Sequence, residues 1–250
     1  MTTRDWDAAT YDRVSDVQES WGREVLARLE LEGGETVMDA GCGTGRVTRA
    51  LIERLPEGRV IAVDVSPAMV EKARDALRAR DEAIVADLTE LELAEPVDAI
   101  LSTAVFHWIP DHDRLFRRLC GALRPGGVLE AQCGGEGNVA AFHAAARRVA
   151  EREPYAAHLG DWRGPWYFSS ATRAEERLQA AGFDDVRCWL EEREARPQEG
   201  RSFLRTVCLG PHLERLPPEL RDDYLDDVLH EVGEPLVLDY VRLNISARRA

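Results

Sequence analysis

One glycine-rich stretch, Thr36–Arg46 (TVMDAGCGTGR), constrains the fold more than any other part of this chain. Residues that favour strands lead into Asp39, glycines then occupy every second position from Gly41 to Gly45, and apolar residues recur at helical spacing from Val47. This order predicts a strand, a tight loop and a helix. Glycine suits such a loop because its backbone takes positive φ and lets a ligand approach without meeting a Cβ atom. The free N–H groups at the start of the helix favour a carboxylate or a phosphate.

The spacing of the glycines distinguishes two kinds of nucleotide-binding loop. Dinucleotide-binding loops follow the pattern Gly-x-Gly-x-x-Gly, whereas here the third glycine comes one position early and Arg46 stands where that pattern has glycine. An acidic residue, Asp39, precedes the first glycine. The resulting Asp-x-Gly-x-Gly-x-Gly arrangement resembles motif I of the class I S-adenosylmethionine-dependent methyltransferases. The alternative is a glycine-rich turn that binds no ligand.

Two further strand-like runs carry carboxylates near their ends. The first, Arg59–Asp64, places Asp64 at the carboxyl end of a strand, where a carboxylate can accept hydrogen bonds from both ribose hydroxyls of a nucleoside. A surface turn is the alternative. Ser66 and Pro67 then predict the start of a helix. The second run, Ala83–Leu88, carries Asp87 near its end. In the resembled family, a carboxylate placed like Asp87 meets the adenine amino group. The resemblance implies these cofactor-binding residues: Asp39, Gly41, Cys42, Gly43, Gly45, Asp64, Val65, Met69, Asp87, Leu88 and Thr103.

A fourth strand is predicted at Val97–Ser102, followed by the run Phe-His-Trp-Ile-Pro-Asp-His from Phe106 to His112. Because parallel α/β sheets place their ligand sites along the carboxyl edge, this loop should face the same crevice as the glycine loop. His107 and Trp108 are therefore candidates to contact the methyl group or its acceptor, with His107 as a positioning group or a base. A capping or solvent-facing histidine is the alternative. The run resembles the trans-aconitate methyltransferase group within the class. His107 and His112 lack the further ligands that a metal site requires, so we expect no metal.

Residues 1–34 are predicted to form N-terminal lid helices. An apolar stripe at intervals of four from Val17 to Leu29 predicts one of them. Ahead of this stripe, Trp6 and Tyr11 resemble the N-terminal lid of small-molecule methyltransferases, in which an aromatic residue closes over the methionine end of the cofactor. The resemblance makes Tyr11 a candidate catalytic residue. Ordinary packing of the lid against the core is the alternative.

The remaining strand patterns complete one methyltransferase domain, with a cofactor-binding half at 35–135 and a substrate-side half at 136–250. Strand-like runs lie at Val128–Cys133 and Asp185–Leu190, and the final run, Val237–Ala247, alternates with period two. The expected fold is α/β: a seven-stranded, mostly parallel sheet with helices on both faces and an antiparallel last strand. This Rossmann-like architecture is the one that the resemblance implies.

Two segments of the second half are candidates for binding the substrate. An aromatic loop carries Trp162, Arg163 and Trp166, and aromatic rings beside an arginine suit an organic acid. Packing of the loop on the core is the alternative. Helical patterns predict an insertion at about 198–234, which resembles the substrate-covering lobe of the same family. Arg205 in this insertion is a candidate carboxylate clamp, and a surface salt bridge is its alternative.

Composition limits the partners and the location of the protein. The formal net charge is −14, from 46 acidic and 32 basic residues in 250, so the overall field repels nucleic acid and anionic membranes. The five cysteines form no Cys-x-x-Cys pair, the N-terminus shows no signal-peptide pattern, and no apolar run has membrane-spanning length. We expect a cytoplasmic protein that is a monomer or a weak homodimer.

The resemblance implies transfer of a methyl group from S-adenosylmethionine to a carboxylate of a small organic acid, giving a monomethyl ester and S-adenosylhomocysteine. A carboxylate with a pKa of about 4 is already ionised and needs no base. The sequence accordingly shows no catalytic triad and no paired-carboxylate pattern. One alternative is methylation of a hydroxyl, amine or carbon of a larger metabolite, with His107 as the base. A cofactor-binding regulatory subunit without activity is another.

Overall fold

The computed structural model describes residues 16–250 of the chain, so Trp6 and Tyr11 lie outside the described residues. The chain divides into two compact units, each of which is built from segments that are distant in sequence. We call them the sheet unit and the helical unit. Among the described residues, the sheet unit comprises those up to Glu136, with Tyr167–Glu191 and Arg242–Ala250, and the helical unit comprises Gly137–Trp166 and Glu192–Val241.

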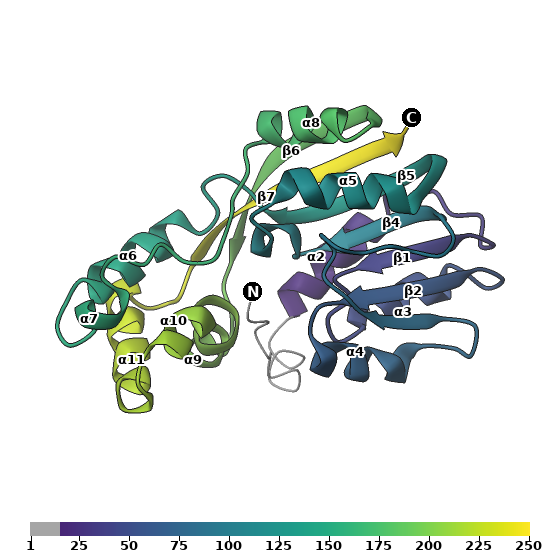
Figure 1. Ribbon diagram of the computed structural model, residues 1–250. Helices are drawn as coiled ribbons and strands as arrows, with labels where there is room; N and C mark the ends of the chain where they lie inside the picture. The colour runs from purple at the N-terminus through teal and green to yellow at the C-terminus, as the bar shows by residue number, and fades with distance from the viewer. Residues whose placement is uncertain (1–15) are drawn as a thin grey trace. The chain divides into compact units, whose positions relative to one another are not determined.

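The strands form one seven-stranded sheet in the order β3-β2-β1-β4-β5-β7-β6 (Figure 1). The pairs β2–β3, β1–β2, β1–β4 and β4–β5 are parallel, whereas β7 runs antiparallel to β5. This arrangement confirms the expected mostly parallel sheet with an antiparallel last strand. The strands are β1 (Thr36–Ala40), β2 (Arg59–Asp64), β3 (Glu82–Val85), β4 (Val97–Thr103), β5 (Leu123–Gly134), β6 (Phe183–Ala195) and β7 (Leu238–Arg249).

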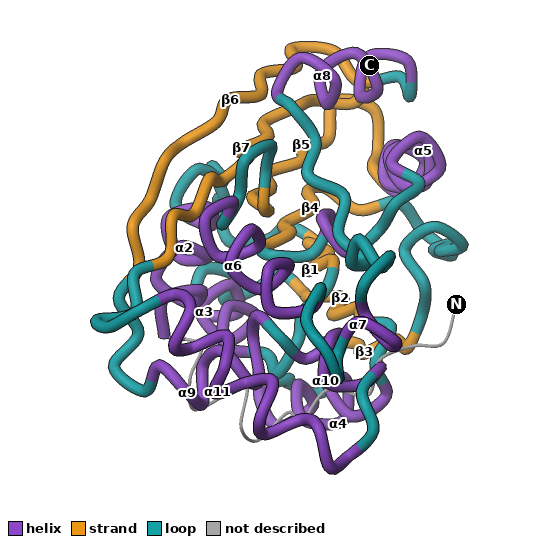
Figure 2. The backbone as a smooth tube through the Cα atoms, turned by 90° about the vertical axis from the view of Figure 1, so that its left-hand side faces the viewer, coloured by secondary structure: helices purple, strands orange, loops and turns teal. Residues whose placement is uncertain are grey.

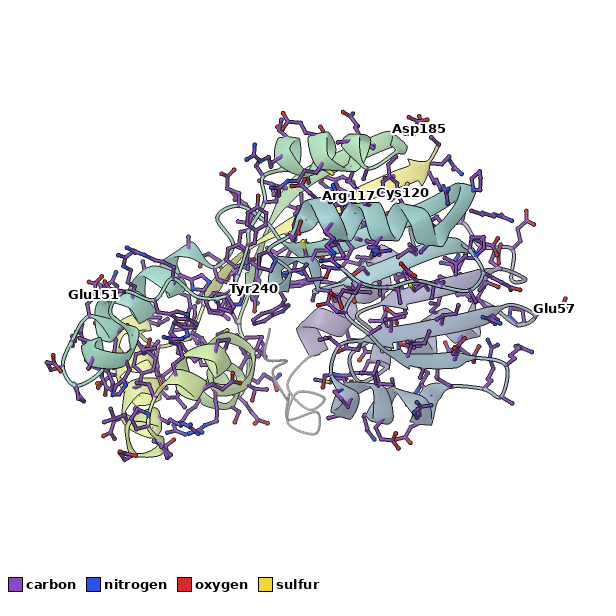
Figure 3. The ribbon with its side chains drawn as sticks, in the orientation of Figure 1. Glu57, Arg117, Cys120, Glu151, Asp185 and Tyr240 are labelled. Atoms are coloured by element: carbon purple, nitrogen blue, oxygen red, sulfur yellow. The ribbon has the colours of Figure 1, made fainter. Side chains whose placement is uncertain are left out.

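Helices cover both faces of the sheet because alternate residues of each buried strand point to opposite sides. Met38 of β1 packs in the core cluster that includes α5 and α8, whereas its neighbour Val37 packs in the cluster that includes α2 and α3. Helix α5 shows the corresponding two sides, since Cys120 faces the core and Arg117 is exposed (Figure 3). The helices named here are α2 (Asp16–Leu26), α3 (Arg46–Glu53), α4 (Pro67–Ala73), α5 (His112–Ala122) and α8 (Ala171–Ala180), with the short turns η1 (Arg74–Ala76) and η2 (Phe106–Trp108).

Local capping signals in the sequence match the observed starts of α4 and α5. The Ser66 hydroxyl accepts a hydrogen bond from the Met69 N–H, and Pro67 occupies the first turn of α4. The Asp111 carboxylate caps α5 in the same way, by accepting from the Arg114 N–H. Strand boundaries were less predictable. β6 extends on both sides of the expected 185–190, and β3 ends at Val85, so Asp87 lies beyond the strand rather than at its end.

The helical unit contains short helices joined by loops, as Figure 2 shows. Its longest helices, α6 and α11, pack together, and the hydroxyl of the buried Tyr224 on α11 donates to the Ala146 carbonyl on α6. The expected insertion at about 198–234 lies in this unit. The helices of the whole helical unit are α6 (Ala140–Ala150), α7 (Ala156–Leu159), α9 (Gly200–Phe203), the π-helix η3 (Leu204–Cys208), α10 (Gly210–Arg215), η4 (Pro218–Leu220) and α11 (Arg221–Val232). Within the described part of the chain, no helix has both the length and the apolar character needed to cross a bilayer.

Candidate functional site

The glycine loop joins β1 to α3, and its three glycines all have positive φ, at 86° for Gly41, 53° for Gly43 and 85° for Gly45. A Cβ atom at Gly41 would lie 2.1 Å from a Val105 methyl carbon, and one at Gly45 would lie 3.0 Å from the Ala73 Cα. At Gly43, by contrast, a Cβ atom would have no neighbour within 4 Å. Two of the glycines are therefore required by packing, whereas Gly43 presents its backbone to open space, as a ligand-binding loop must.

Asp64, at the end of β2, holds the loop in this conformation. One carboxylate oxygen accepts the Gly43 N–H at 3.0 Å, and the other accepts the Ser66 N–H at 2.9 Å. Burial raises the pKa of the Asp64 carboxyl, and these N–H donors act against that rise. A carboxylate offers about four acceptor positions, so both oxygens keep capacity for two further donors such as a ribose diol.

Asp39, the acidic residue of the motif, is only 1% exposed. The Thr48 hydroxyl on α3 donates to its carboxylate at 2.6 Å, which ties the end of β1 to the helix behind the loop. Burial raises the pKa of Asp39 from 3.8 to about 6, against the lowering effect of the Thr48 bond, and the charge of Asp64 adds a smaller rise. This placement favours a role in supporting the loop over direct contact with a ligand.

The other expected cofactor-binding residues differ widely in exposure. Val65 is 40% exposed, whereas Leu88 is 4% exposed and packs in the α5-side core. Asp87 is exposed and accepts hydrogen bonds from both the N–H and the hydroxyl of Thr89, each at 2.8 Å. Cys42, within the glycine loop, and Met69, in α4, are both buried. The contact of each with a cofactor stays a prediction, and the burial of Leu88 leaves little of its surface for an adenine ring.

Thr103 ends β4, which lies next to β1 in the sheet, and His107 lies just beyond it in η2. The His107 ring is buried, stacks on Phe168 at a centroid distance of 6.0 Å, and accepts the Gly134 N–H at Nδ1 over 3.2 Å. Burial lowers the pKa of His107 well below 6.5, and the charge of Arg242 and then His112 lower it further. The ring is therefore neutral near pH 7. Because Nδ1 accepts, its single proton is on Nε2, which makes His107 a hydrogen-bond donor there rather than a base.

His112, the second histidine of the motif, supports the loop internally. Its Nε2 lies 3.0 Å from the Phe106 carbonyl, and its ring packs edge-on against Tyr167. The Tyr167 N–H in turn donates to the His107 carbonyl at 2.9 Å. Among residues 16–250, no group of three or more His, Cys, Asp or Glu side chains is arranged to hold a metal ion.

The sequence-based reasoning missed Arg242, which is 4% exposed on β7. Its Nε donates to the Gln132 side-chain oxygen at 3.3 Å, and its guanidinium lies 5.1 Å from the ring centroid of Trp21 on α2. The available signal was the alternation of β7, in which apolar residues at 241, 243 and 245 leave Arg242 on the other face. Because helices were expected on both faces, that polar face had to be buried under one of them.

The expected substrate-binding residues other than Trp108 lie in the helical unit. Trp162 and Trp166 both pack against the buried His212, at centroid distances of 4.8 and 5.7 Å. Arg163 is exposed. Arg205 forms an ion pair with Asp222 on the surface of this unit. This contact corresponds to the surface salt bridge that was the alternative to a carboxylate clamp. The half-buried Trp108 lies in the sheet unit, tilted against His107 at 5.3 Å.

Comparison with known proteins shows the family of this chain. Residues 37–127 match a family described as a methyltransferase domain. A trans-aconitate 2-methyltransferase of Methylobacterium radiotolerans is 36% identical over 89% of this chain and 86% of its own length. One from Methylobacterium nodulans is 31% identical over 98% of each chain, and one from Variovorax paradoxus is 32% identical over 96% of this chain and 94% of its own.

Solved structures of other enzymes share the fold. A phosphoethanolamine N-methyltransferase of Haemonchus contortus, in complex with S-adenosylhomocysteine, aligns with a TM-score of 0.64 at 20% identity. The alignment covers 97% of this chain but 56% of that longer protein. A cyclopropane synthase of Mycobacterium tuberculosis aligns with a TM-score of 0.59 at 20% identity, over 93% of this chain and 85% of its own. The glycine loop, the carboxylate of Asp64 and relatives matched over nearly their whole length lead to one conclusion: the chain belongs to the trans-aconitate 2-methyltransferase family and is an S-adenosylmethionine-dependent methyltransferase.

Proposed function

We propose that the protein esterifies a carboxylate of a small organic acid that resembles trans-aconitate, giving a monomethyl ester. The observation that carries this proposal is the likeness to three relatives named trans-aconitate 2-methyltransferase, each over 89% or more of this chain. The protonation of His107 supports it, because a neutral ring whose Nε2 already carries the proton suits an acceptor that needs no deprotonation.

The residues of the glycine loop fit the cofactor of the family. Gly43 leaves open space where a nucleoside can lie against the backbone, and Asp64 keeps acceptor capacity for ribose hydroxyls. We propose that these two residues, with Val65 and Asp87 in the loops that follow β2 and β3, hold S-adenosylmethionine. When bound, S-adenosylmethionine supplies an activated methyl group on a sulfonium.

The protein's own contribution is then mainly orientation. A carboxylate is ionised near pH 7, so the site must hold it in line for the displacement, and such positioning supplies much of the rate enhancement in intramolecular reactions. We propose that the Nε2–H of His107 donates to the acceptor acid and fixes its angle of approach. Trp108, beside His107, then limits the space in which the acid can move. Roles for Trp162, Arg163 and Trp166 in holding the acid stay predictions, as does the catalytic role of Tyr11.

The proposal is tested by incubating the purified protein with labelled S-adenosylmethionine and a panel of small polycarboxylic acids. Mass spectrometry should show a mass increase of one methyl group, and mild alkali should remove the label because the product is an ester. Ether, N-methyl and C-methyl products resist that treatment. Label that is stable to alkali, obtained only with hydroxyl- or amine-containing metabolites, would favour the alternative acceptor class and reject the proposal.

Two features support the expected setting of this reaction. The five cysteines are all buried free thiols, as expected for the cytoplasm, where we propose that the protein works. The net charge of −14 disfavours nucleic acid as a substrate. We propose that the protein acts as a monomer or weak homodimer, which sedimentation at two concentrations would test.

A further inference from the structure

A row of polar side chains crosses the face of the sheet under α2. Arg28, in the turn that follows α2, is bonded through all three of its guanidinium nitrogens, to Glu130 at 2.8 Å, to Asn244 at 2.7 Å and to the Ala131 carbonyl at 3.0 Å. Glu130 also accepts from the Ser246 hydroxyl at 2.5 Å. The row therefore begins with an arginine that is tied to β5 and β7 by protein acceptors.

The other end of the row lies at the carboxyl edge of the sheet. Arg242 pairs in register with Gly134, the last residue of β5, so it lies at the carboxyl edge of that parallel strand. The same Gly134 donates its N–H to His107, which brings the guanidinium and the histidine to one point of the edge. Parallel α/β sheets place their ligands along this edge.

The guanidinium of Arg242 is held in one orientation by contacts on two sides. Its Nε bonds to a neutral amide, Gln132, and its plane lies over the Trp21 ring. Gln132 is fixed in turn, because its amide nitrogen donates to Asn244 at 2.9 Å. A guanidinium that is already fixed in one orientation loses little conformational entropy when it forms two hydrogen bonds with a carboxylate.

We propose that Arg242 is the specificity-determining residue for the acid: it binds a carboxylate that is not methylated, while His107 donates to the acceptor end of the same molecule. This inference rests on the proposed function. It assigns the substrate class as acids with at least two carboxylates. The net charge of −14 makes such a local cation necessary, because the overall field repels an anionic substrate.

The experiment compares Arg242→Lys with Arg248→Lys, a control on the same strand whose exposed side chain bonds to the Gly126 carbonyl. Each variant is assayed with a polycarboxylic acid and with a monocarboxylic analogue that lacks the second carboxylate. We expect Arg242→Lys to raise KM for the polyacid about 10- to 100-fold. The KM for the analogue should change less than threefold. The affinity for S-adenosylhomocysteine, measured by calorimetry, should change less than twofold. Arg248→Lys should match the wild type throughout.

A second variant keeps the test decisive if Arg242→Lys folds poorly. Gln132→Glu is close in shape and places a carboxylate against Nε of Arg242, so it should compete with the substrate and raise KM for the polyacid while the arginine remains. Equal losses on the polyacid and the analogue, or an unchanged KM in both variants, would overturn the role of Arg242 and leave the esterification standing. A wild-type protein that esterifies no acid of the panel would instead reject the proposed function, and the inference with it.

Discussion

Gly134 donates its backbone N–H to Nδ1 of His107 across 3.2 Å, and this single bond decides what the histidine can do. In the neutral ring, Nε2 then carries the proton, and the lowered pKa of His107 keeps the ring neutral through the physiological range. A histidine in this state donates a hydrogen bond without taking part in proton transfer.

The first prediction is that activity does not depend on the ionisation of His107. For the wild type, kcat/KM should be flat from about pH 6.5 to about pH 8.5, because the pKa of this ring lies well below 6.5. The profile is measured with initial rates at low acid concentration. His107→Phe, which keeps a ring against Phe168, should lower kcat/KM roughly tenfold through loss of one donor, and equally at every pH. If kcat/KM of the wild type instead fell below about pH 6.5, and this fall were absent in His107→Phe, His107 would act as a general base.

The second prediction separates the glycines of the loop. Gly43→Ala places a methyl group in the open space, so S-adenosylhomocysteine should bind at least tenfold more weakly, whereas stability should fall by only about 1–2 kcal/mol from the positive φ. Gly41→Ala should instead lower the melting temperature much more, because its Cβ overlaps Val105. Calorimetry and thermal unfolding of both variants check this. Unaltered cofactor binding by Gly43→Ala would show that the loop does not hold the nucleoside there.

The third prediction concerns the buried carboxyl of Asp39. Its folded pKa of about 6 lies above the ordinary 3.8, so the folded state holds the proton more firmly and loses stability as pH rises between those values. Asp39→Asn cannot ionise and keeps an acceptor for Thr48. Its stability relative to the wild type should therefore increase by roughly 3 kcal/mol between about pH 4 and pH 6.5, and then level off. Urea unfolding across this range measures the difference.

The same variant tests what Asp39 is for. If it only supports the loop, Asp39→Asn should bind S-adenosylhomocysteine within about threefold of the wild type. Asp64→Asn is the matched comparison, and it should weaken binding by roughly 1.5–3 kcal/mol, because it removes charge-assisted bonds to the ribose. A larger binding defect in Asp39→Asn than in Asp64→Asn would contradict this assignment of roles.

The fourth prediction concerns the arginines that the sequence favoured. Arg205 pairs with Asp222 at the surface, and exposed ion pairs of this kind contribute about 0–1 kcal/mol. Arg205→Lys should therefore change neither stability nor KM for the acid appreciably. Arg163→Lys is assayed beside it, since Arg163 is exposed. A KM defect in either variant that exceeds the defect of Arg242→Lys would move the acid-binding residue to the helical unit.

The sequence predicted those parts of the candidate site whose residues are close together both in the chain and in the fold. The loop at Gly43, the carboxylate of Asp64 and the cap at Ser66 are set by neighbours within a few positions, so spacing and residue type were sufficient. Arg242 could not be found in this way, because its proposed role depends on pairing with Gly134, more than one hundred positions earlier. The tautomer of His107 depends on that same Gly134 N–H, a contact that no periodicity records.

The order of the strands also has a consequence for synthesis of the protein. Of the seven described strands, β7 comes last in chain order and so leaves the ribosome after the other six, yet it takes the place between β5 and β6. Until β7 arrives, β5 has an open edge on the side that it will cover, and a nascent chain with such an edge is prone to pair with others. The strand that carries Arg242 thus closes the sheet and completes the proposed acid site in one late step, so we expect that partly synthesised chains cannot yet select their substrate.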